Sequence, residues 1–236
     1  MGSFRWWRWA GCENLYRIPQ PVNRVPINLV DRLCKHLNYR IFPPVCRLCG
    51  NPGLPELDLC LLCHRALPCR PSPKLFGDGL VLAGFDYGNP VDGLIRHFKF
   101  QAQLGAGRLL ARLCEPAFED SRPMALVPVP LHIRRLRQRG FNQSLELARY
   151  WGRRRGLPVQ PSALIRHRDT AMQSTLTSPE REPNVRGAFR AVMPLPRHVA
   201  LIDDVFTTGA TCRAAREALF AAGVQQVDVW CLARVT

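Results

Sequence analysis

The chain has 236 residues, of which 47% are hydrophobic and 22% charged, and 33 Lys and Arg stand against 18 Asp and Glu. This composition excludes a mostly disordered chain, and no apolar run approaches the roughly 20 residues that a membrane-spanning helix needs. The first ten residues contain Trp and Arg in place of the apolar stretch of a secretory signal, so we expect a cytoplasmic protein without a membrane span, whose ten cysteines bind metal or are buried thiols.

The positive charge is concentrated in the middle of the chain. Residues 121–186 carry 13 Lys and Arg against 4 Asp and Glu, and four arginines lie within six residues: Arg134, Arg135, Arg137 and Arg139. Such a cluster suits polyanions, either phosphate groups or nucleic acid. The alternative is a solvated basic helix in a chain that prefers Arg throughout, because only three of the 33 basic residues are Lys. Charge alone leaves both open.

The N-terminal part of the chain divides into an arm and a cysteine-rich module. Residues 1–25 show no clear hydrophobic period. We interpret them as a loose arm or as an artefact of an early start codon. Residues 26–40 carry apolar side chains at helical spacing, which predicts a short amphipathic helix with Cys34 as a buried thiol. Residues 41–79 are rich in Pro, Gly and Cys, and such a segment cannot build a core without a staple. We therefore predict a helix and a metal-binding module over residues 26–79.

Four cysteines in this module form two C-x2-C pairs that are ten residues apart: Cys46 with Cys49, and Cys60 with Cys63. Each pair lets one tight turn present two sulfurs to the same ion, and Gly50 permits the backbone twist of such a turn. Two turns together give a closed tetrahedral site of four thiolates, which is typical of structural Zn²⁺. The alternatives are a pair of redox C-x-x-C motifs, unpaired buried thiols, and His64 as a substitute ligand.

From Leu80 to the C-terminus, apolar strands alternate with helices. The predicted strands are Leu80–Tyr87, Ala125–Val129, Leu164–Arg166, Val199–Ile202 and Val227–Leu232. The predicted helices are Val91–Phe118, broken or kinked near Gly105 and Gly107, Ser144–Arg155 and Ala210–Ala222. This alternation is typical of an α/β fold with a mostly parallel sheet flanked by helices on both faces, so we predict one such domain over residues 80–236.

The segment from Val199 to Thr211 contains the most informative chemical pattern: an apolar strand, two carboxylates, a turn of hydroxyls and glycine, and an Ala-rich helix. In open α/β sheets, ligands bind at the carboxyl ends of strands, and the start of the next helix favours a phosphate group. The residues that we assign to this site are Asp203, Asp204, Thr207, Thr208, Gly209, Ala210 and Thr211. Two carboxylates beside a phosphate suit a ribose diol or a Mg²⁺ ion. The alternative is a capped helix start without a ligand.

A second phosphate site is predicted after the strand Ala125–Val129. The arginine cluster follows this strand, and the arginine side chain is well shaped for bidentate phosphate binding. The residues that we assign to this second site are Arg134, Arg135, Arg139 and Asn142. Asn142 and Gln143 either orient a substrate or only begin the helix at Ser144.

The Val199–Thr211 pattern resembles the signature of type I phosphoribosyltransferases, which bind phosphoribosyl pyrophosphate (PRPP). The resemblance implies that Asp203 and Asp204 contact the ribose hydroxyls and that the Thr207–Thr211 turn holds the 5′-phosphate. The second, basic site would then hold the pyrophosphate, so that two phosphate sites fit PRPP. It also implies displacement of pyrophosphate at the ribose C1, with Mg²⁺ bound to the pyrophosphate. Because no residue stands out as a catalytic base, turnover stays open.

Further motifs resemble the ComF family of competence proteins, which includes GntX-type DNA-utilisation proteins. Between about Ile27 and the C-terminus these motifs are Ile95–Phe100 (IRHFKF), Pro128–Leu131 (PVPL), Arg139–Ser144 (RGFNQS), Arg168-x-Thr170-x-x-Gln173-x-x-Leu176 and Arg181-x-x-Asn184. The resemblance implies a cytoplasmic protein of DNA uptake or DNA utilisation, with a type I phosphoribosyltransferase-like domain behind a small zinc-ribbon-like module. By analogy with the wider fold, it makes Arg168, Gln173, Arg181 and Asn184 part of a mobile lid; the alternative is a surface loop.

Two functions follow from these patterns. The first is a PRPP-binding phosphoribosyltransferase-like protein that uses Mg²⁺. The second is a non-catalytic adaptor that binds single-stranded DNA through the arginine cluster and Trp6, Trp7 and Trp9, or that contacts the DNA-import helicase implied by the family resemblance. The two are not exclusive. The intact Asp203–Asp204 pair disfavours a third class, a zinc-stapled interaction protein with an unused phosphate pocket.

Overall fold

The computed structural model of the chain describes residues 43–68, 71–168, 178–192 and 194–235. Within them, six strands form one sheet in the order β1-β2-β8-β6-β3, and β7 pairs with β8 off this path. The strands are β1 (Lys74–Phe76), β2 (Gly79–Asp86), β3 (Ala125–Pro128), β6 (His198–Ile202), β7 (Val205–Phe206) and β8 (Gln226–Arg234). Within this sheet all the paired strands are parallel except β1 with β2, so most carboxyl ends lie at one edge.

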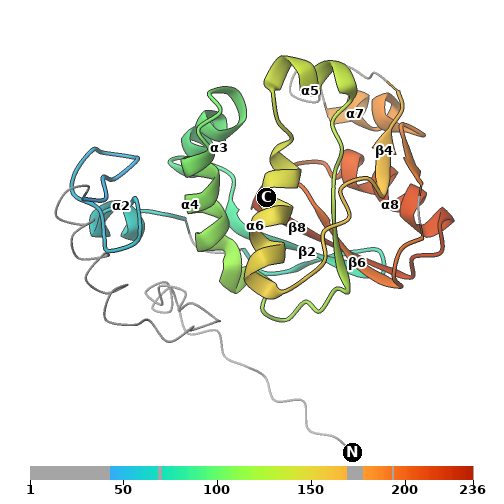
Figure 1. Ribbon diagram of the computed structural model, residues 1–236, viewed down its shortest axis with the longest axis horizontal. Helices are drawn as coiled ribbons and strands as arrows, with labels where there is room; N and C mark the ends of the chain where they lie inside the picture. Colours follow the sequence, from blue (N-terminus) through green and yellow to red (C-terminus); the bar gives the residue numbers. More distant parts are fainter. Residues whose placement is uncertain (1–42, 69–70, 169–177, 193, 236) are drawn as a thin grey trace, which may run out of the picture.

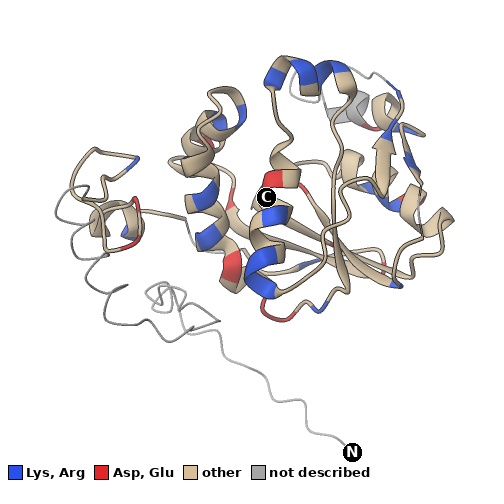
Figure 2. Ribbon diagram, in the orientation of Figure 1, with Lys and Arg blue, Asp and Glu red and all other residues tan. Residues whose placement is uncertain are grey.

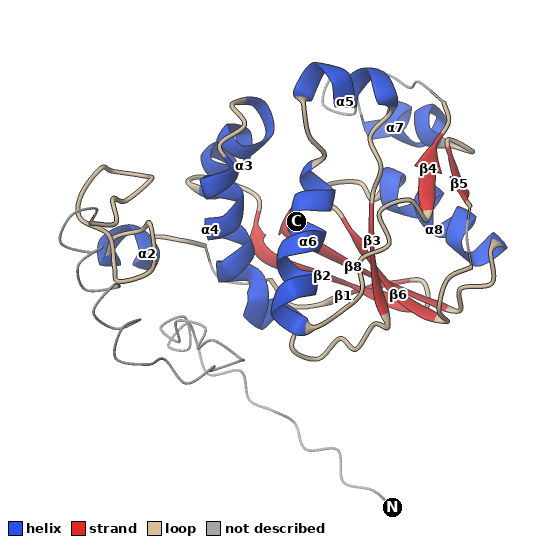
Figure 3. Ribbon diagram, in the orientation of Figure 1, coloured by secondary structure: helices blue, strands red, loops and turns tan. Residues whose placement is uncertain are grey.

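Helices cover both faces of this sheet (Figures 1 and 3). The helices of the described residues are α2 (Leu61–Arg65), which belongs to the cysteine module, α3 (Val91–Phe100), α4 (Leu104–Cys114), α5 (Ile133–Arg139), α6 (Gln143–Arg155), α7 (Ser178–Val185) and α8 (Ala210–Ala221), with a 3-10 helix, η2, at Glu115–Phe118. The core on one face is shared with α3, α4 and α6. The core on the other face is shared with α8 and with a separate antiparallel pair, β4 (Leu164–Arg166) and β5 (Phe189–Ala191). None of the helices in the described ranges is long and apolar enough to cross a membrane.

The sheet is buried on both faces because its central strands alternate between two apolar clusters. On β8, Trp230 and Leu232 belong to the cluster of α3, α4 and α6, whereas Val229 and Cys231 belong to the cluster of α8. Phe118 of η2 stacks on Trp230 with the ring centroids 4.6 Å apart. A strand that is apolar on both sides lies inside a covered sheet, and β8 accordingly lies in the interior of the sheet, between β2 and β6.

The predicted fold class is confirmed: a mixed α/β fold with a mostly parallel sheet flanked by helices follows a small four-cysteine module. All five predicted strands occur, but Leu164–Arg166 pairs with β5 outside the main sheet. The sequence did not predict the short elements α2, β1, β5 and β7. The boundaries proposed after residues 25 and 79 stay predictions.

The break in the predicted helix Val91–Phe118 lies elsewhere than expected. The helix stops at Gln101–Gln103, and Gly105 and Gly107 lie inside α4. A Cβ atom on Gly107 would lie 2.5 Å from the ring of Phe98, so this glycine lets α3 and α4 pack closely and does not end a helix. Sequence alone does not separate a glycine that breaks a helix from one that brings two helices together.

Two segments for which we predicted no helix boundaries contain helices. The arginine cluster forms α5, and the second half of the predicted lid forms α7, with Pro183 inside it. The predicted arm, the predicted helix at residues 26–40 with Cys34, the three tryptophans near the N-terminus, and Gln173 lie outside the described residues.

Candidate functional site

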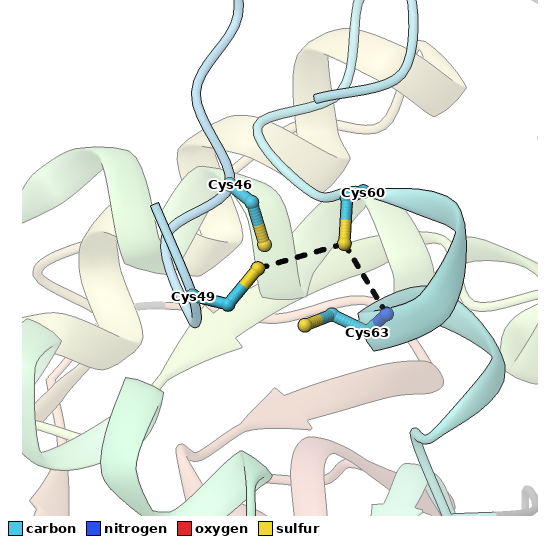
Figure 4. Close-up of side chains that lie close together, drawn as sticks. All are labelled: Cys46, Cys49, Cys60 and Cys63. Atoms are coloured by element: carbon cyan, nitrogen blue, oxygen red, sulfur yellow. Dashed lines mark hydrogen bonds between the residues drawn. The ribbon is translucent and has the colours of Figure 1, made fainter. Parts of the chain in front are cut away.

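The four cysteines of the two C-x2-C pairs point toward one another (Figure 4). Their sulfur atoms all lie within 4.8 Å of one another, with 3.6 Å between the sulfurs of Cys49 and Cys60. Gly50 has a φ of +75°, the left-handed backbone that turns the first pair inward, and the sulfur of Cys60 caps α2 by accepting from the Cys63 amide. A tetrahedral site with Zn–S bonds of about 2.3 Å needs sulfurs about 3.8 Å apart, so the cluster fits a metal ion such as zinc.

The surroundings of these thiols act differently on each of them. Burial opposes ionisation of Cys46, but hydrogen bonds from backbone amides of both pairs outweigh it and lower the pKa of the Cys46 thiol to about 6. The pKa of Cys63 is raised, chiefly through its side-chain hydrogen bond with Cys49. Four thiolates this close repel one another without a cation, so we expect full ionisation of the cluster only with a bound metal ion.

The cysteine module packs against α4. Glu56 of the module forms an ion pair with Arg112 of α4 at 3.9 Å. A Cβ atom on Gly105 of α4 would lie 2.1 Å from the guanidinium of Arg47, so the two parts approach closely. Since Leu59 of the module belongs to the same apolar cluster as α3 and α4, we expect metal binding to stabilise this side of the core as well.

Asp203 and Asp204 form a two-residue bulge at the carboxyl edge of the sheet. β6 ends directly before the bulge and β7 begins directly after it, while β8 pairs with both strands. The Asp203 amide donates to the Trp230 carbonyl at 3.0 Å, and the Asp204 carbonyl accepts from the Leu232 amide at 3.0 Å. The backbone of β8 therefore holds this acidic bulge in place.

The Asp203 carboxylate is partly exposed and, among the described residues, has polar neighbours on both of its oxygens. Its Oδ1 accepts from the Asp204 amide at 2.8 Å and lies 3.5 Å from Ser144 Oγ, while its Oδ2 lies 3.7 Å from the Cys212 sulfur. Burial, followed by the charge of Asp204, raises the pKa of Asp203 to about 7. This carboxyl can therefore bind or release a proton near neutral pH.

Asp204 forms the ion pair of the bulge. Lys99, in the last turn of α3, has its Nζ 2.9 Å from Asp204 Oδ1, and the two side chains are 21% and 12% exposed. Arg139, at the end of α5, lies over the ring of Phe100 at 5.2 Å. Burial lowers the pKa of Arg139, and the charge of Asp204 opposes that shift. α3 and α5 thus bring two cations to the edge where β6 delivers two acids.

The turn after the acidic bulge begins α8. Gly209 has a φ of +76° and precedes the helix, and a Cβ atom there would lie 2.6 Å from an aromatic ring of β7. Glycine is therefore favoured by the backbone conformation and by the close packing. Thr207 is exposed, and Thr208 Oγ1 accepts from the Ala210 amide at 3.4 Å; Thr211 lies in the first helical turn. Hydroxyl groups and a helix start thus lie next to the two acids in sequence.

The predicted second phosphate site is divided between exposed and structural residues. Arg134 is exposed and Arg135 half-buried on α5. Asn142 caps α6, because its Oδ1 accepts from the Ser144 amide at 3.0 Å and its Nδ2 donates to the Val129 carbonyl at 3.1 Å. Both ends of the Asn142 side chain are thus bonded within the protein, which favours the alternative that this residue begins the helix.

Gln143, the residue after this cap, has an unpartnered donor. It is 1% exposed, and within the described residues its Nε2 has no hydrogen-bond partner. A buried amide donor left unpaired costs about 1–3 kcal/mol unless a water or a ligand satisfies it. Its neighbour Ser144 contacts Asp203, so this donor lies one residue from the acidic bulge along α6.

The predicted lid is only partly within the described residues. Arg168 is exposed and donates to the Arg186 carbonyl at 2.8 Å, while Arg181 and Asn184 lie on α7. Glu182 of α7 pairs with Arg213 of α8 at 3.1 Å, which ties this helix to the one that follows the Gly209 turn. A role as a lid stays a prediction.

Sequence reasoning missed three residues at the bulge: Lys99, Ser144 and Cys212. Lys99 lies in the IRHFKF motif and Ser144 ends the RGFNQS motif, so a signal was present for both. The sequence does not show which residues these side chains contact, since Ser144 and Asp203 are 59 positions apart in the chain. Cys212 had no signal of its own, because an Ala-rich helix with one cysteine is typical of a buried core position.

Comparison with known proteins gives several relatives. The chain is similar to Competence protein F of Haemophilus influenzae, with 35% identity over 197 residues that cover 79% of this chain and 84% of the relative. It is similar to DNA utilization protein YhgH of Escherichia coli (strain K12), with 33% identity over 208 residues that cover 80% and 90% of the two chains. Competence protein ComFC of Streptococcus pneumoniae is 25% identical over 151 residues, which cover 64% and 66%. No protein-family model matches the chain.

Proposed function

Because the chain belongs to the ComF family, we propose that it is a phosphoribosyltransferase-like protein of the cytoplasm that binds PRPP with Mg²⁺ and takes part in DNA uptake or DNA utilisation. The printed names of its relatives, competence protein and DNA utilization protein, support the second half of this proposal. The observation that supports the first half is the acidic bulge, which lies at the carboxyl edge of a parallel sheet, directly before a glycine-containing turn and a helix.

Each part of this edge suits one group of PRPP. The ribose hydroxyls would donate to the carboxylates of Asp203 and Asp204. The 5′-phosphate would lie at the Thr207–Thr211 turn, where hydroxyl groups and the helix dipole favour an anion. Arg139 and Arg134 of α5 would face the pyrophosphate, whose negative charge a bound Mg²⁺ also offsets.

Transfer of the phosphoribosyl group would need an acceptor nucleophile. Its lone pair would form a bond to the ribose C1, the C1–O bond to the pyrophosphate would break, and pyrophosphate would leave with that electron pair. The protein would contribute positioning and charge stabilisation. The proposal is therefore one of ligand binding, and it leaves enzyme activity open because the sequence identifies no acceptor.

Titration calorimetry with PRPP and Mg²⁺ tests this proposal. We expect the wild-type protein to bind, and Asp203→Asn and Asp204→Asn each to lose about tenfold or more in affinity, because each removes an acceptor for a ribose hydroxyl. Asp120→Asn, at an exposed acid in the loop before β3, is the matched control and should bind like the wild type. A wild-type protein that gives no binding heat, or bulge variants that match it, would refute the proposal.

We also propose that the metal ion of the cysteine module is structural Zn²⁺. Its support is the closed set of four sulfurs at zinc-like spacing. Elemental analysis of protein purified without chelator should give one zinc per chain for the wild type and for Cys12→Ser, which changes a thiol outside both pairs. Cys49→Ser should lose most of the metal. Wild-type protein without zinc would contradict this assignment.

A second candidate function, as a single-stranded-DNA adaptor, is favoured by exposed arginines on α5 and α6 (Figure 2). Arg137 and Arg153 are both exposed. Such side chains bind a phosphate backbone, and this binding is favoured because counterions are released from the nucleic acid. Binding to a labelled oligonucleotide should weaken steeply with salt, and Gln at both positions should lower the slope by about 2. Arg190→Gln on β5 is the control. Undetectable binding at low salt would refute this function, and the same variants would test a contact with the DNA-import helicase.

A further inference from the structure

Lys99 is a cation that α3 brings to the acidic bulge. Val91, Ile95 and Phe98 anchor the helix in the core, each at most 1% exposed. The backbone position of Lys99 is therefore fixed by packing, while the rotatable bonds of its four-carbon side chain allow the ammonium more than one position. The residue is also unusual in this chain, since only three of the 33 basic residues are Lys.

The Lys99–Asp204 ion pair contributes little stability as a purely structural contact. Both side chains are mostly buried, and removing two charges from water offsets most of the attraction between them. Asp203 receives a backbone amide hydrogen bond, whereas within the described ranges the group at bonding distance from the Asp204 carboxylate is the Lys99 ammonium. A ribose hydroxyl that approaches Oδ1 of Asp204 therefore competes with this ammonium for the same oxygen.

We propose that Lys99 is a ligand-binding residue with two positions, an inference that rests on the proposed PRPP site. In the free protein its ammonium pairs with Asp204. When the ribose hydroxyls engage Asp204, the ammonium turns to the pyrophosphate group. Lys99 thus exchanges one anionic partner for another, and neither state leaves a buried charge without a partner.

The chemistry of the two cations supports this division of roles. An ammonium is a compact charge with three donors on a flexible stem, which suits a change of partner. Arg139 is a planar guanidinium that lies over the ring of Phe100, so its orientation is set by that contact. Lys99 is therefore the cation suited to move, and Arg139 the one suited to stay.

A comparison of two ligands isolates the pyrophosphate contact. The affinities of the wild type, Lys99→Gln and Lys74→Gln are measured by calorimetry for PRPP and for ribose 5-phosphate, each with Mg²⁺. Lys74 is the exposed lysine of β1 and serves as the matched control. We expect Lys99→Gln to bind PRPP about 10- to 100-fold more weakly, the usual effect of losing a charge-assisted hydrogen bond, and Lys74→Gln to match the wild type. Lys99→Gln should bind ribose 5-phosphate within about threefold of the wild type.

The outcomes separate this inference from the function on which it rests. Equal losses for both ligands in Lys99→Gln would show that Lys99 only positions Asp204, which overturns the inference. Unchanged PRPP affinity in that variant would also overturn it and leave the PRPP site intact. A wild type that binds neither ligand would remove the PRPP site and the role of Lys99 together. Lys99→Arg keeps the charge and should recover part of the PRPP affinity.

The small number of lysines gives a second measurement that needs no loss of charge. Reductive methylation with ¹³C-formaldehyde labels the three lysines and the terminal amine, and the spectrum of Lys99→Arg assigns the Lys99 signal. Saturating PRPP should shift this signal, because the ammonium changes partner, and should leave the Lys74 signal in place. A Lys99 signal that PRPP does not move would overturn the proposal even if Lys99→Gln fails to fold.

Discussion

Replacing Asp203 with Asn should make the protein more stable at neutral pH, although it removes a residue of the proposed ligand site. Burial and the charge of Asp204 raise the pKa of Asp203 from 3.8 to about 7. At 1.36 kcal/mol per unit, this shift of about 3 units corresponds to about 4 kcal/mol. Because the side chain is partly exposed and water screens part of the charge, we expect about 2–4 kcal/mol.

The sign follows from the protonation of the folded and unfolded chains. Below the ordinary pKa of 3.8, Asp203 is neutral in both states and its burial is not opposed by a charge. Between that pH and about 7, the unfolded chain ionises while the folded protein keeps the proton, so the wild type loses stability as the pH rises. Above about 7 the loss is complete. The substituted side chain of Asp203→Asn does not titrate. The free energy of unfolding of this variant therefore exceeds that of the wild type by an amount that grows through this pH window and then levels off.

Urea unfolding at about pH 5 and about pH 8 measures this difference in the free energy of unfolding. The gain for Asp203→Asn should be larger at the higher pH, and Asp120→Asn should show no gain at either. Asp228→Asn gives the opposite sign, because Asp228 is 2% exposed and accepts from Ser121 Oγ at 2.6 Å and from the Leu80 amide at 3.0 Å. A gain that does not change with pH, or a loss for Asp203→Asn at pH 8, would refute this reasoning.

Three further predictions concern the metal, the turn and the core. Removing the metal with a chelator should lower the midpoint of thermal unfolding of the wild type and leave Cys49→Ser unchanged, which differential scanning calorimetry can measure. Gly209→Ala should lose about 2 kcal/mol of stability and bind PRPP more weakly. Alanine is strained at the positive φ of this position, and its Cβ would lie 2.6 Å from the ring of Phe206. Gly88→Ala, where a Cβ meets nothing within 4 Å, is its control and should stay near the wild type in the same urea and calorimetric assays. Glu115→Gln should lose about 2–3 kcal/mol in urea unfolding, since Glu115 is 8% exposed and holds Arg154 by bonds of 3.0 and 3.2 Å; a loss below about 0.5 kcal/mol would contradict it.

The parts of the fold that the sequence predicted are those whose pattern is local. The strand Val199–Ile202 is a continuous apolar run, and the structure places β6 there with one more residue at its start. The helix Ser144–Arg155 ends at Gly156, which has a φ of +66° in the structure, as a glycine that ends a helix should. The spacing of the two C-x2-C pairs predicts the four-sulfur cluster that the structure shows, because both sulfurs of a pair come from one turn.

The parts that the sequence did not predict depend on contacts between distant segments. Lys99 gave no sign of its partner, because only the packing of α3 on the sheet brings it to Asp204. The helix break at Gln101–Gln103 was misplaced at the glycines, since their closeness to Phe98 and Arg47 exists only after folding. The short strand β7 also depends on a contact between distant segments. Val205 and Phe206 pair with β8 only because the acidic bulge places them beside it.

Acidic residues at the two ends of the sheet have opposite surroundings. Near the start of β8, the carboxylate of Asp228 lies at hydrogen-bonding distance from Ser121 Oγ, His198 Nε2 and the Leu80 amide. At the carboxyl edge, burial and the neighbouring charge of Asp204 raise the pKa of Asp203 to about 7. Stability alone favours the first arrangement, because it satisfies a buried charge, whereas the second opposes two charges. An arrangement that lowers stability at one edge of a well-packed sheet is typical of a functional site. The opposite signs expected for Asp203→Asn and Asp228→Asn therefore distinguish an acid whose position lowers stability from an acid whose hydrogen bonds raise it.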